Sequence, residues 1–174
     1  ACDDQRMGRI STPKHSPARL PSPSPIPRKM SHANYEAPHT RRPWSALLPA
    51  HPNTDVWPTN SLPPTVLGCT DGTSIWLTVE QTVAEARCTL VHELIHLERG
   101  HSVCQPPDVE ADVAREAAQR LIPIGELADV LTQTRSELEA ADLLWVDVDT
   151  LRTRLAFLDD VERTRLGLTH DLAC

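Results

Sequence analysis

The chain has few aromatic residues and no long apolar run. Phenylalanine, tyrosine and tryptophan together make up only 3% of its 174 residues, so a folded core must be built mainly from Leu, Val, Ile and Ala. A membrane-spanning helix needs about 20 consecutive apolar residues, and no stretch of the chain comes near that length. Residues 1–29 contain no apolar segment of the kind found in secretory signal peptides. We therefore expect a cytoplasmic protein that has no membrane partner.

Cysteine is also sparse, and its pattern excludes a disulfide scaffold. The five cysteines are odd in number, irregular in spacing and form no CxxC pair: Cys2, Cys69, Cys88, Cys104 and Cys174. Disulfide frameworks and cysteine-rich zinc sites show regular, paired spacings. The pattern favours a protein whose thiols stay reduced, as in the cytoplasm.

Lysine is absent after residue 29, and the rest of the chain is strongly acidic. Residues 30–174 contain eleven Arg against twenty-two Asp and Glu, whereas residues 1–29 hold six basic and two acidic residues. Nucleic-acid affinity comes largely from basic groups that displace counterions from phosphates. The acidic body therefore argues against nucleic acid as a direct partner.

The N-terminal part, residues 1–40, is rich in proline and predicts a disordered tail. Six prolines lie between residues 13 and 27, with serine and basic residues between them. Such a composition buries too little apolar surface to fold. Met30 begins a more ordinary sequence and is a candidate natural start of the protein. We expect residues 41–174 to form the folded domain, with a C-terminal helical segment.

The folded part is expected to be an α+β domain in which a small antiparallel sheet precedes a run of helices. Residues 65–70 and 73–79 are two β-prone runs, and Asp71-Gly72 between them favours a tight hairpin turn. Capping and breaking residues then predict five helices. These begin at Thr82 (ending near Arg99 and Gly100), Asp108 (ending by Pro123), Ser136 (with Glu139 completing a capping box), Asp147 or Asp149 (ending at Leu158), and Asp160.

The helix expected from Thr82 carries two histidines one turn apart. Glu85 lies three residues after Thr82, and the two form a capping box. Apolar residues recur at steps of three and four along one predicted buried stripe: Val83, Ala86, Leu90, Leu94 and Leu97. At about 100° per residue, His92 and His96 fall on the opposite side of the helix. Two imidazoles at this spacing can bind one metal ion.

Glu93 follows the first of these histidines, in the sequence His92-Glu93-Leu94-Ile95-His96. Neutral imidazole suits zinc, and zinc lowers the pKa of a coordinated water to roughly 7. A carboxylate beside that water can take its proton and pass it to a leaving amine. A solvated helix face could hold the same residues by chance, but the capped and periodic helix favours a zinc peptidase in which His92 and His96 bind Zn²⁺ and Glu93 is the catalytic base.

A third protein ligand is needed, since catalytic zinc keeps its fourth position for water. The candidates are Glu110, Glu116, His101, Cys104 and Cys88. His101 and Cys104 follow the helix end so closely that they would need a sharp return of the chain. Cys88 and His96 lie eight residues, or about 12 Å, apart along the helix axis. That separation favours Cys88 as a small buried residue rather than a ligand.

Glu110 is the preferred third ligand and Glu116 is the alternative. Glu110 lies within the apolar face predicted for the second helix, which is formed by Val109, Val113, Ala114, Ala117 and Leu121. A carboxylate on such a face needs a partner, because an unpaired buried charge is very costly. Glu110 could instead merely complement the N-terminus of the helix. Glu116 lies at the edge of the same face.

The segment from Arg87 to Gly100, which contains the two histidines and Glu93, resembles the ImmA/IrrE family of zinc metallopeptidases. Residues 110–123 and 144–155 also resemble short members from high-GC bacteria and phages, and the resemblance covers residues 55–166. It implies a zincin-like domain, places Glu110 in the register of the family's ligand glutamate, and implies a helix-turn-helix repressor as protein substrate. The connection between His96 and Glu110 is shorter than in typical members.

Two other interpretations compete with an endopeptidase. Residues 136–157 faintly resemble a helix-turn-helix, which would suit a non-enzymatic regulator, but the segment is acidic and a recognition helix should be basic. A docking or packing role suits that segment better. A structural zinc site without catalysis is the other alternative, although it leaves Glu93 without a role.

Substrate binding can also be predicted from the order of the elements. The hairpin strand Ser74–Leu77 runs directly into the histidine helix, so we expect its edge to border the cleft and to pair with an extended peptide. Arg99 and His101 are candidates for stabilising the oxyanion.

Overall fold

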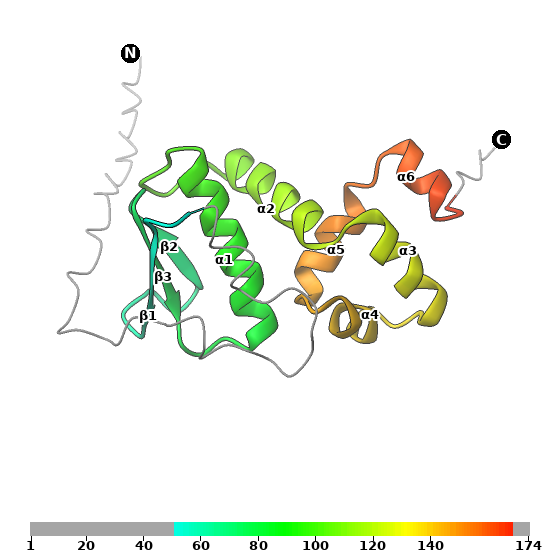
Figure 1. Ribbon diagram of the computed structural model, residues 1–174, viewed down its shortest axis with the longest axis horizontal. Coiled ribbons are helices and arrows are strands. Elements are labelled where there is room, and N and C mark those ends of the chain that lie inside the picture. The colour runs from blue at the N-terminus through cyan, green and yellow to red at the C-terminus, as the bar shows by residue number, and fades with distance from the viewer. Residues whose placement is uncertain (1–50, 169–174) are drawn as a thin grey trace, which may run out of the picture.

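The computed structural model describes residues 51–168, which form a three-stranded sheet and six helices (Figure 1). The strands are β1 (Asp55–Thr59), β2 (Gly68–Thr70) and β3 (Ser74–Thr78). The helices are α1 (Val83–Glu98), α2 (Pro107–Leu121), α3 (Ile124–Gln133), α4 (Glu137–Leu144), α5 (Val148–Ala156) and α6 (Asp160–Arg165). The α+β class is confirmed. The predicted tail, residues 1–40 with Met30, lies outside the described residues.

The sheet is mixed, so the expectation of an antiparallel sheet is wrong. β2 and β3 form the predicted antiparallel hairpin, and its turn is held by Asp71, whose Oδ1 accepts hydrogen bonds from the Thr73 and Ser74 amides at 2.9 and 2.8 Å. β1 pairs with the other side of β3 in parallel. Pro58 lacks a backbone N–H to donate, so local sequence rules disfavour a strand at β1. Because β1 is an edge strand, it tolerates proline.

The order β1-β3-β2 makes β3 the central strand. The predicted role of the Ser74–Leu77 edge in binding an extended peptide is therefore wrong, because both edges of β3 are already paired. The reason lies in the parallel partner, which comes from before the hairpin in the chain and leaves no hairpin signal.

Helix α1 is buried from two sides and lies between the sheet and the other helices (Figure 1). One face packs on the sheet and consists of Ala86, Leu90 and Leu94. A second face enters the helical core and consists of Cys88, Val91 and Ile95. Val83, which was expected in the buried stripe, is exposed. Because two faces are occupied by packing, the side chains of His92, Glu93 and His96 share the remaining side of the helix.

Most helix ends follow the predicted caps. The Thr82–Glu85 capping box begins α1, and Gly100 with φ 72° follows its end. Asp147, rather than Asp149, caps α5 by accepting from the Thr150 amide at 2.7 Å. The predicted cap at Asp108 is wrong, since the N-cap of α2 is Pro106, two residues earlier, and the helix begins at Pro107.

Helix α3 was not predicted, and the capping box expected for α4 is only half formed. Pro123 precedes α3 and Gly125 lies in its first turn, a pair that reads as a break in the sequence. Ser136 accepts from the Glu139 amide at 3.4 Å, but the Glu139 carboxylate accepts from the Thr134 hydroxyl at 2.6 Å instead of closing the box.

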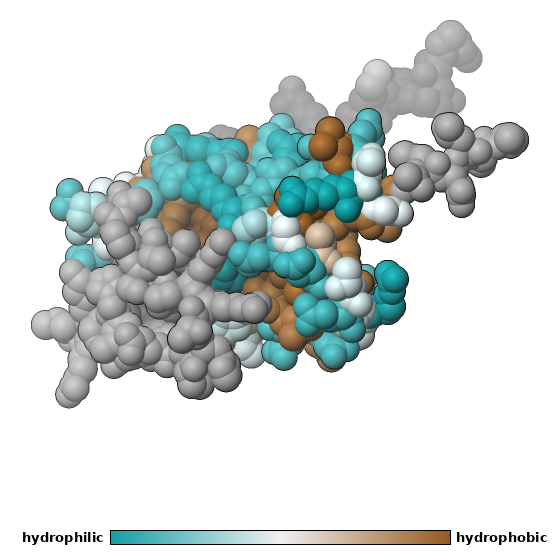
Figure 2. All heavy atoms as spheres, turned by 45° about the vertical axis from the view of Figure 1, so that its right-hand side comes forward, coloured by the Kyte–Doolittle hydropathy of each residue, from teal (hydrophilic) through white to brown (hydrophobic). Residues whose placement is uncertain are grey.

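The helical half forms one core with the second face of α1. Arg154 of α5 is buried there, donates from Nε to the Ile122 carbonyl at 3.0 Å and pairs with Glu162 of α6. The helix-turn-helix-like segment contributes packing residues to this core: Ala140, Ala141, Leu144, Val146 and Leu151. Figure 2 shows apolar patches among hydrophilic surface on this half. Within residues 51–168, no helix combines the length and apolar character needed to cross a bilayer.

Candidate metal centre

His92 and His96 of α1 and Glu110 of α2 form one compact group, which we call the ligand triad. The two histidine Nε2 atoms are 3.0 Å apart, and Glu110 Oε2 lies 3.1 Å from His92 Nε2 and 3.2 Å from His96 Nε2. A tetrahedral zinc with bonds of about 2.0–2.1 Å holds its ligand atoms about 3.3–3.4 Å apart. The spacing and chemistry of the triad therefore suit a single zinc ion, and zinc binding by these three residues stays a prediction.

The environment of the two histidines also suits metal binding. Burial lowers the pKa of both histidines, against the opposing effect of Glu110. Neutral imidazole is the form that binds a metal ion. The side chain of His96 is only 7% exposed, whereas those of His92 and Glu110 are 27% and 39% exposed. The triad is thus open to solvent on the side of His92 and Glu110.

The second oxygen of Glu110 is held by backbone. Its Oε1 accepts from the Gln105 amide at 3.2 Å, just before α2 begins. This bond leaves Oε2 directed at the histidines and favours a carboxylate that binds through one oxygen.

Glu93 is buried beside the triad and against the sheet. Its pKa is raised to about 8, chiefly by burial and further by the charge of Glu110. A Cβ added at Gly68 of β2 would lie 3.1 Å from Glu93 Cγ and 2.5 Å from Thr89 Cγ2, so the β2 backbone approaches α1 closely here. Only glycine allows this approach without a shift.

Strand β2 is an edge of the sheet and lies over Glu93. Leu67 O bonds to Thr78 N and Asp71 N bonds to Ser74 O, at 2.9 and 3.3 Å. Alternation along an antiparallel pair then turns the backbone groups of Gly68 and Thr70 away from β3. The edge beside the triad therefore belongs to β2, not to β3 as the sequence suggested.

The remaining candidates have other partners. Glu116 bonds to Arg99 at 2.6 Å and to Arg120 at 2.5 Å, and Arg120 also bonds to Glu98. Within residues 51–168, the ligand triad is the only group of three or more His, Cys, Asp or Glu side chains that could hold a metal ion. Glu116, Cys88 and Cys104 are not part of such a group. Cys88 is buried in the helical core, and Cys104 is exposed.

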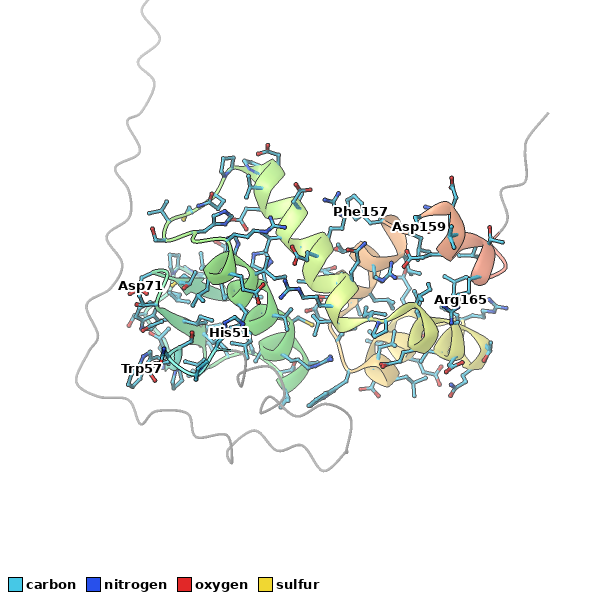
Figure 3. All side chains as sticks on the ribbon, turned by 45° about the horizontal axis from the view of Figure 1, so that its top comes forward. His51, Trp57, Asp71, Phe157, Asp159 and Arg165 are labelled. Carbon is cyan, nitrogen blue, oxygen red and sulfur yellow. The ribbon has the colours of Figure 1, made fainter. Side chains whose placement is uncertain are left out.

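Figure 3 places His51 beside α1, Asp71 at the tip of the hairpin, and Phe157 at the end of α5. His51 Nε2 lies 3.1 Å from Glu98 Oε1, so it adds a polar contact to the ion pairs at the end of α1. These pairs connect α1 to α2 beyond His96, and they hold together the two helices that carry the triad.

Sequence reasoning missed the residues that support the triad rather than form it. Gly68, whose backbone approaches Glu93, and Gln105, whose amide holds Glu110, carry no motif, and their roles depend on contacts that no local pattern records. His101 was considered as a ligand or an oxyanion group, but its Nδ1 lies 2.9 Å from Nδ1 of His96, on the far side of that ring from the triad. Only its closeness to the helix end could have signalled this contact.

Comparisons of the chain with protein-family models, with curated proteins and with solved structures find no match.

Proposed function

We propose that this protein is a zinc-dependent endopeptidase that hydrolyses a peptide bond in a protein substrate. The observation that carries the proposal is the convergence of His92, His96 and Glu110 beside a buried Glu93. Two histidines and one glutamate match the ligand set of catalytic zinc sites, in which the fourth position serves water or substrate. When bound, zinc supplies Lewis acidity, which makes water a competent nucleophile near neutral pH.

Glu93 has the environment of a general base. In the metal-free chain, burial and the neighbouring Glu110 raise its pKa to about 8, and the positive charge of a bound zinc ion would favour the ionised carboxylate, which can accept a proton. The backbone of Gly68 approaches its side chain from the sheet side. We assign to Glu93 the transfer of a proton from the attacking water to the leaving amine.

An extended peptide is the substrate form that suits the edge of β2. The outward backbone groups of Gly68 and Thr70 can pair with a peptide backbone, which would place a scissile bond near Glu93. The resemblance to the ImmA/IrrE family points to a helix-turn-helix repressor as the protein cleaved, and the acidic surface suits a protein rather than nucleic acid as partner.

The test is a comparison of the wild type with Glu93→Gln, which keeps the size of the side chain but removes its basicity. Both proteins should contain one zinc per chain. Cleavage should fall by about two to four orders of magnitude in the variant, the usual scale for loss of a general base.

Cells that express each form, together with a repressor encoded at the same locus, are analysed by labelling all new protein N-termini. New termini that depend on Glu93 support the endopeptidase. Full zinc occupancy with identical termini in both forms would favour a structural zinc site, and wild-type protein without zinc would refute the proposal.

A further inference from the structure

The connector between α1 and α2, residues 99–106, contacts two members of the ligand triad. Gly100 takes a positive φ of 72°, and the His101 amide donates back to the His96 carbonyl at 2.9 Å. This turn folds His101 over the end of α1 and brings its Nδ1 to 2.9 Å from Nδ1 of His96. At its other end, the connector provides the Gln105 amide that holds Glu110.

The contact between the two imidazoles is directional. The ring centroids of His96 and His101 are 5.2 Å apart and the rings are inclined by 54°, so they meet through nitrogen atoms rather than by stacking. A hydrogen bond between two ring nitrogens needs one N–H and one lone pair. If His96 presents the lone pair of Nε2 to a metal, its proton lies on Nδ1, so His96 donates and His101 accepts.

We propose that His101 is a positioning residue of the metal site, which fixes the tautomer and ring orientation of His96. The inference rests on the proposed zinc site. Metal-binding histidines usually donate their other ring N–H to a carboxylate, a carbonyl or water. Here a second imidazole takes that place, and the donor is a buried ring with little freedom to find another acceptor.

The turn between β2 and β3 lies near the connector. A Cβ added at Gly72, in the β2–β3 turn, would lie 3.5 Å from Ser102 Cβ and 3.8 Å from the His101 carbonyl oxygen. The β2–β3 turn therefore lies close to the connector. The short connection between His96 and Glu110 thus places one supporting group on each of two ligands.

The test compares His101→Phe with His101→Asn. Phenylalanine keeps a planar ring but offers no acceptor, whereas the side-chain oxygen of asparagine lies at the same distance from the backbone as Nδ1. Zinc affinity is measured by competition with a chromogenic chelator, and Co²⁺ absorption reports the coordination geometry. Unfolding of chelator-treated protein serves as the control for the fold.

His101→Phe should bind zinc about 10–100-fold more weakly than wild type, the scale for loss of a supporting hydrogen bond. Its Co²⁺ spectrum should change, while the unfolding of the chelator-treated protein stays close to wild type. His101→Asn should recover most of the affinity and the wild-type spectrum. If His101→Phe fails to fold, His101→Ala takes its place in the comparison with His101→Asn.

Two results are separable. Wild-type protein that binds no zinc would refute the proposed function itself. Wild-type protein that binds zinc, together with unchanged affinity and spectrum in the variants that lack an acceptor, would overturn only the role of His101. Equal weakening by asparagine and phenylalanine would also overturn it, because the acceptor would then not matter.

Discussion

The assignment of the third ligand can be tested by one matched pair of substitutions, Glu110→Gln and Glu116→Gln. Both make the same chemical change on the same helix. Glu110 Oε2 lies 3.1–3.2 Å from the two histidine Nε2 atoms, so its loss replaces a charged ligand by a neutral amide. Glu116 bonds to Arg99 and Arg120 instead, so its loss breaks exposed ion pairs only.

The size of the effect follows from linkage between zinc binding and folding. A ligand that binds only the folded chain at 100 times its Kd stabilises it by about 2.7 kcal/mol. In a domain of roughly 120 residues, each kcal/mol moves Tm by roughly 3–5 °C, so zinc should raise Tm by about 8–13 °C. Loss of a ligand that weakens binding at least 100-fold leaves about 0.4 kcal/mol at the same zinc concentration, or about 1–2 °C.

The assay is thermal unfolding of chelator-treated protein with and without added zinc. Glu116→Gln should lower Tm slightly, since exposed ion pairs contribute about 0.2–1 kcal/mol each. It should nevertheless keep the full zinc shift, whereas Glu110→Gln should lose nearly all of it. A shift that survives Glu110→Gln and disappears in Glu116→Gln would refute the assignment and make Glu116 the ligand.

Two further predictions concern the surroundings of the site and the helical half. Gly68→Ala should reduce cleavage and cost about 1–3 kcal/mol of stability, since the new methyl meets Thr89 Cγ2 at 2.5 Å. Thr89→Ser removes Cγ2 of Thr89, so the double variant should regain stability in urea unfolding and activity in cleavage assays. A double variant no better than Gly68→Ala would contradict the steric argument. Glu162→Gln should cost about 1–3 kcal/mol near neutral pH, because it leaves buried Arg154 poorly paired. Arg154 holds the pKa of Glu162 below its ordinary 4.5, so the stabilisation exists above that pH and is lost as pH falls through the lowered pKa. In urea unfolding, the difference in free energy of unfolding between wild type and Glu162→Gln should shrink in acid. A difference that does not change with pH would exclude the Arg154–Glu162 pair as its source.

Local signals in the sequence were sufficient for the parts of the fold that depend on neighbouring residues. The Thr82–Glu85 cap, the Gly100 end of α1 and the Asp71-Gly72 turn are short-range devices, and each lies where it was predicted. The placement of His92, Glu93 and His96 on one side of α1 follows from helical periodicity alone.

The sequence did not reveal which strands pair when they lie far apart in the chain. β1 joins β3 in parallel from before the hairpin, and no local pattern records a partner that lies nineteen residues away in register. Local propensity disfavours a strand at Pro58 and a helix that starts between Pro123 and Gly125. Tertiary packing overrides these propensities in β1 and α3.

The sequence by itself determined that His92, Glu93 and His96 share one side of a capped helix, because the spacing of residues along a helix is a local property. The tertiary structure decided which other residues lie beside them. Glu110 and Glu116 are both acidic, both on α2 and six residues apart, and only the packing of α2 on α1 brings the first to the histidines and the second to Arg99 and Arg120. His101 and Gly68 likewise gain their roles from a turn and a close approach between elements, which are set by the shape of the whole core rather than by their neighbours in the chain.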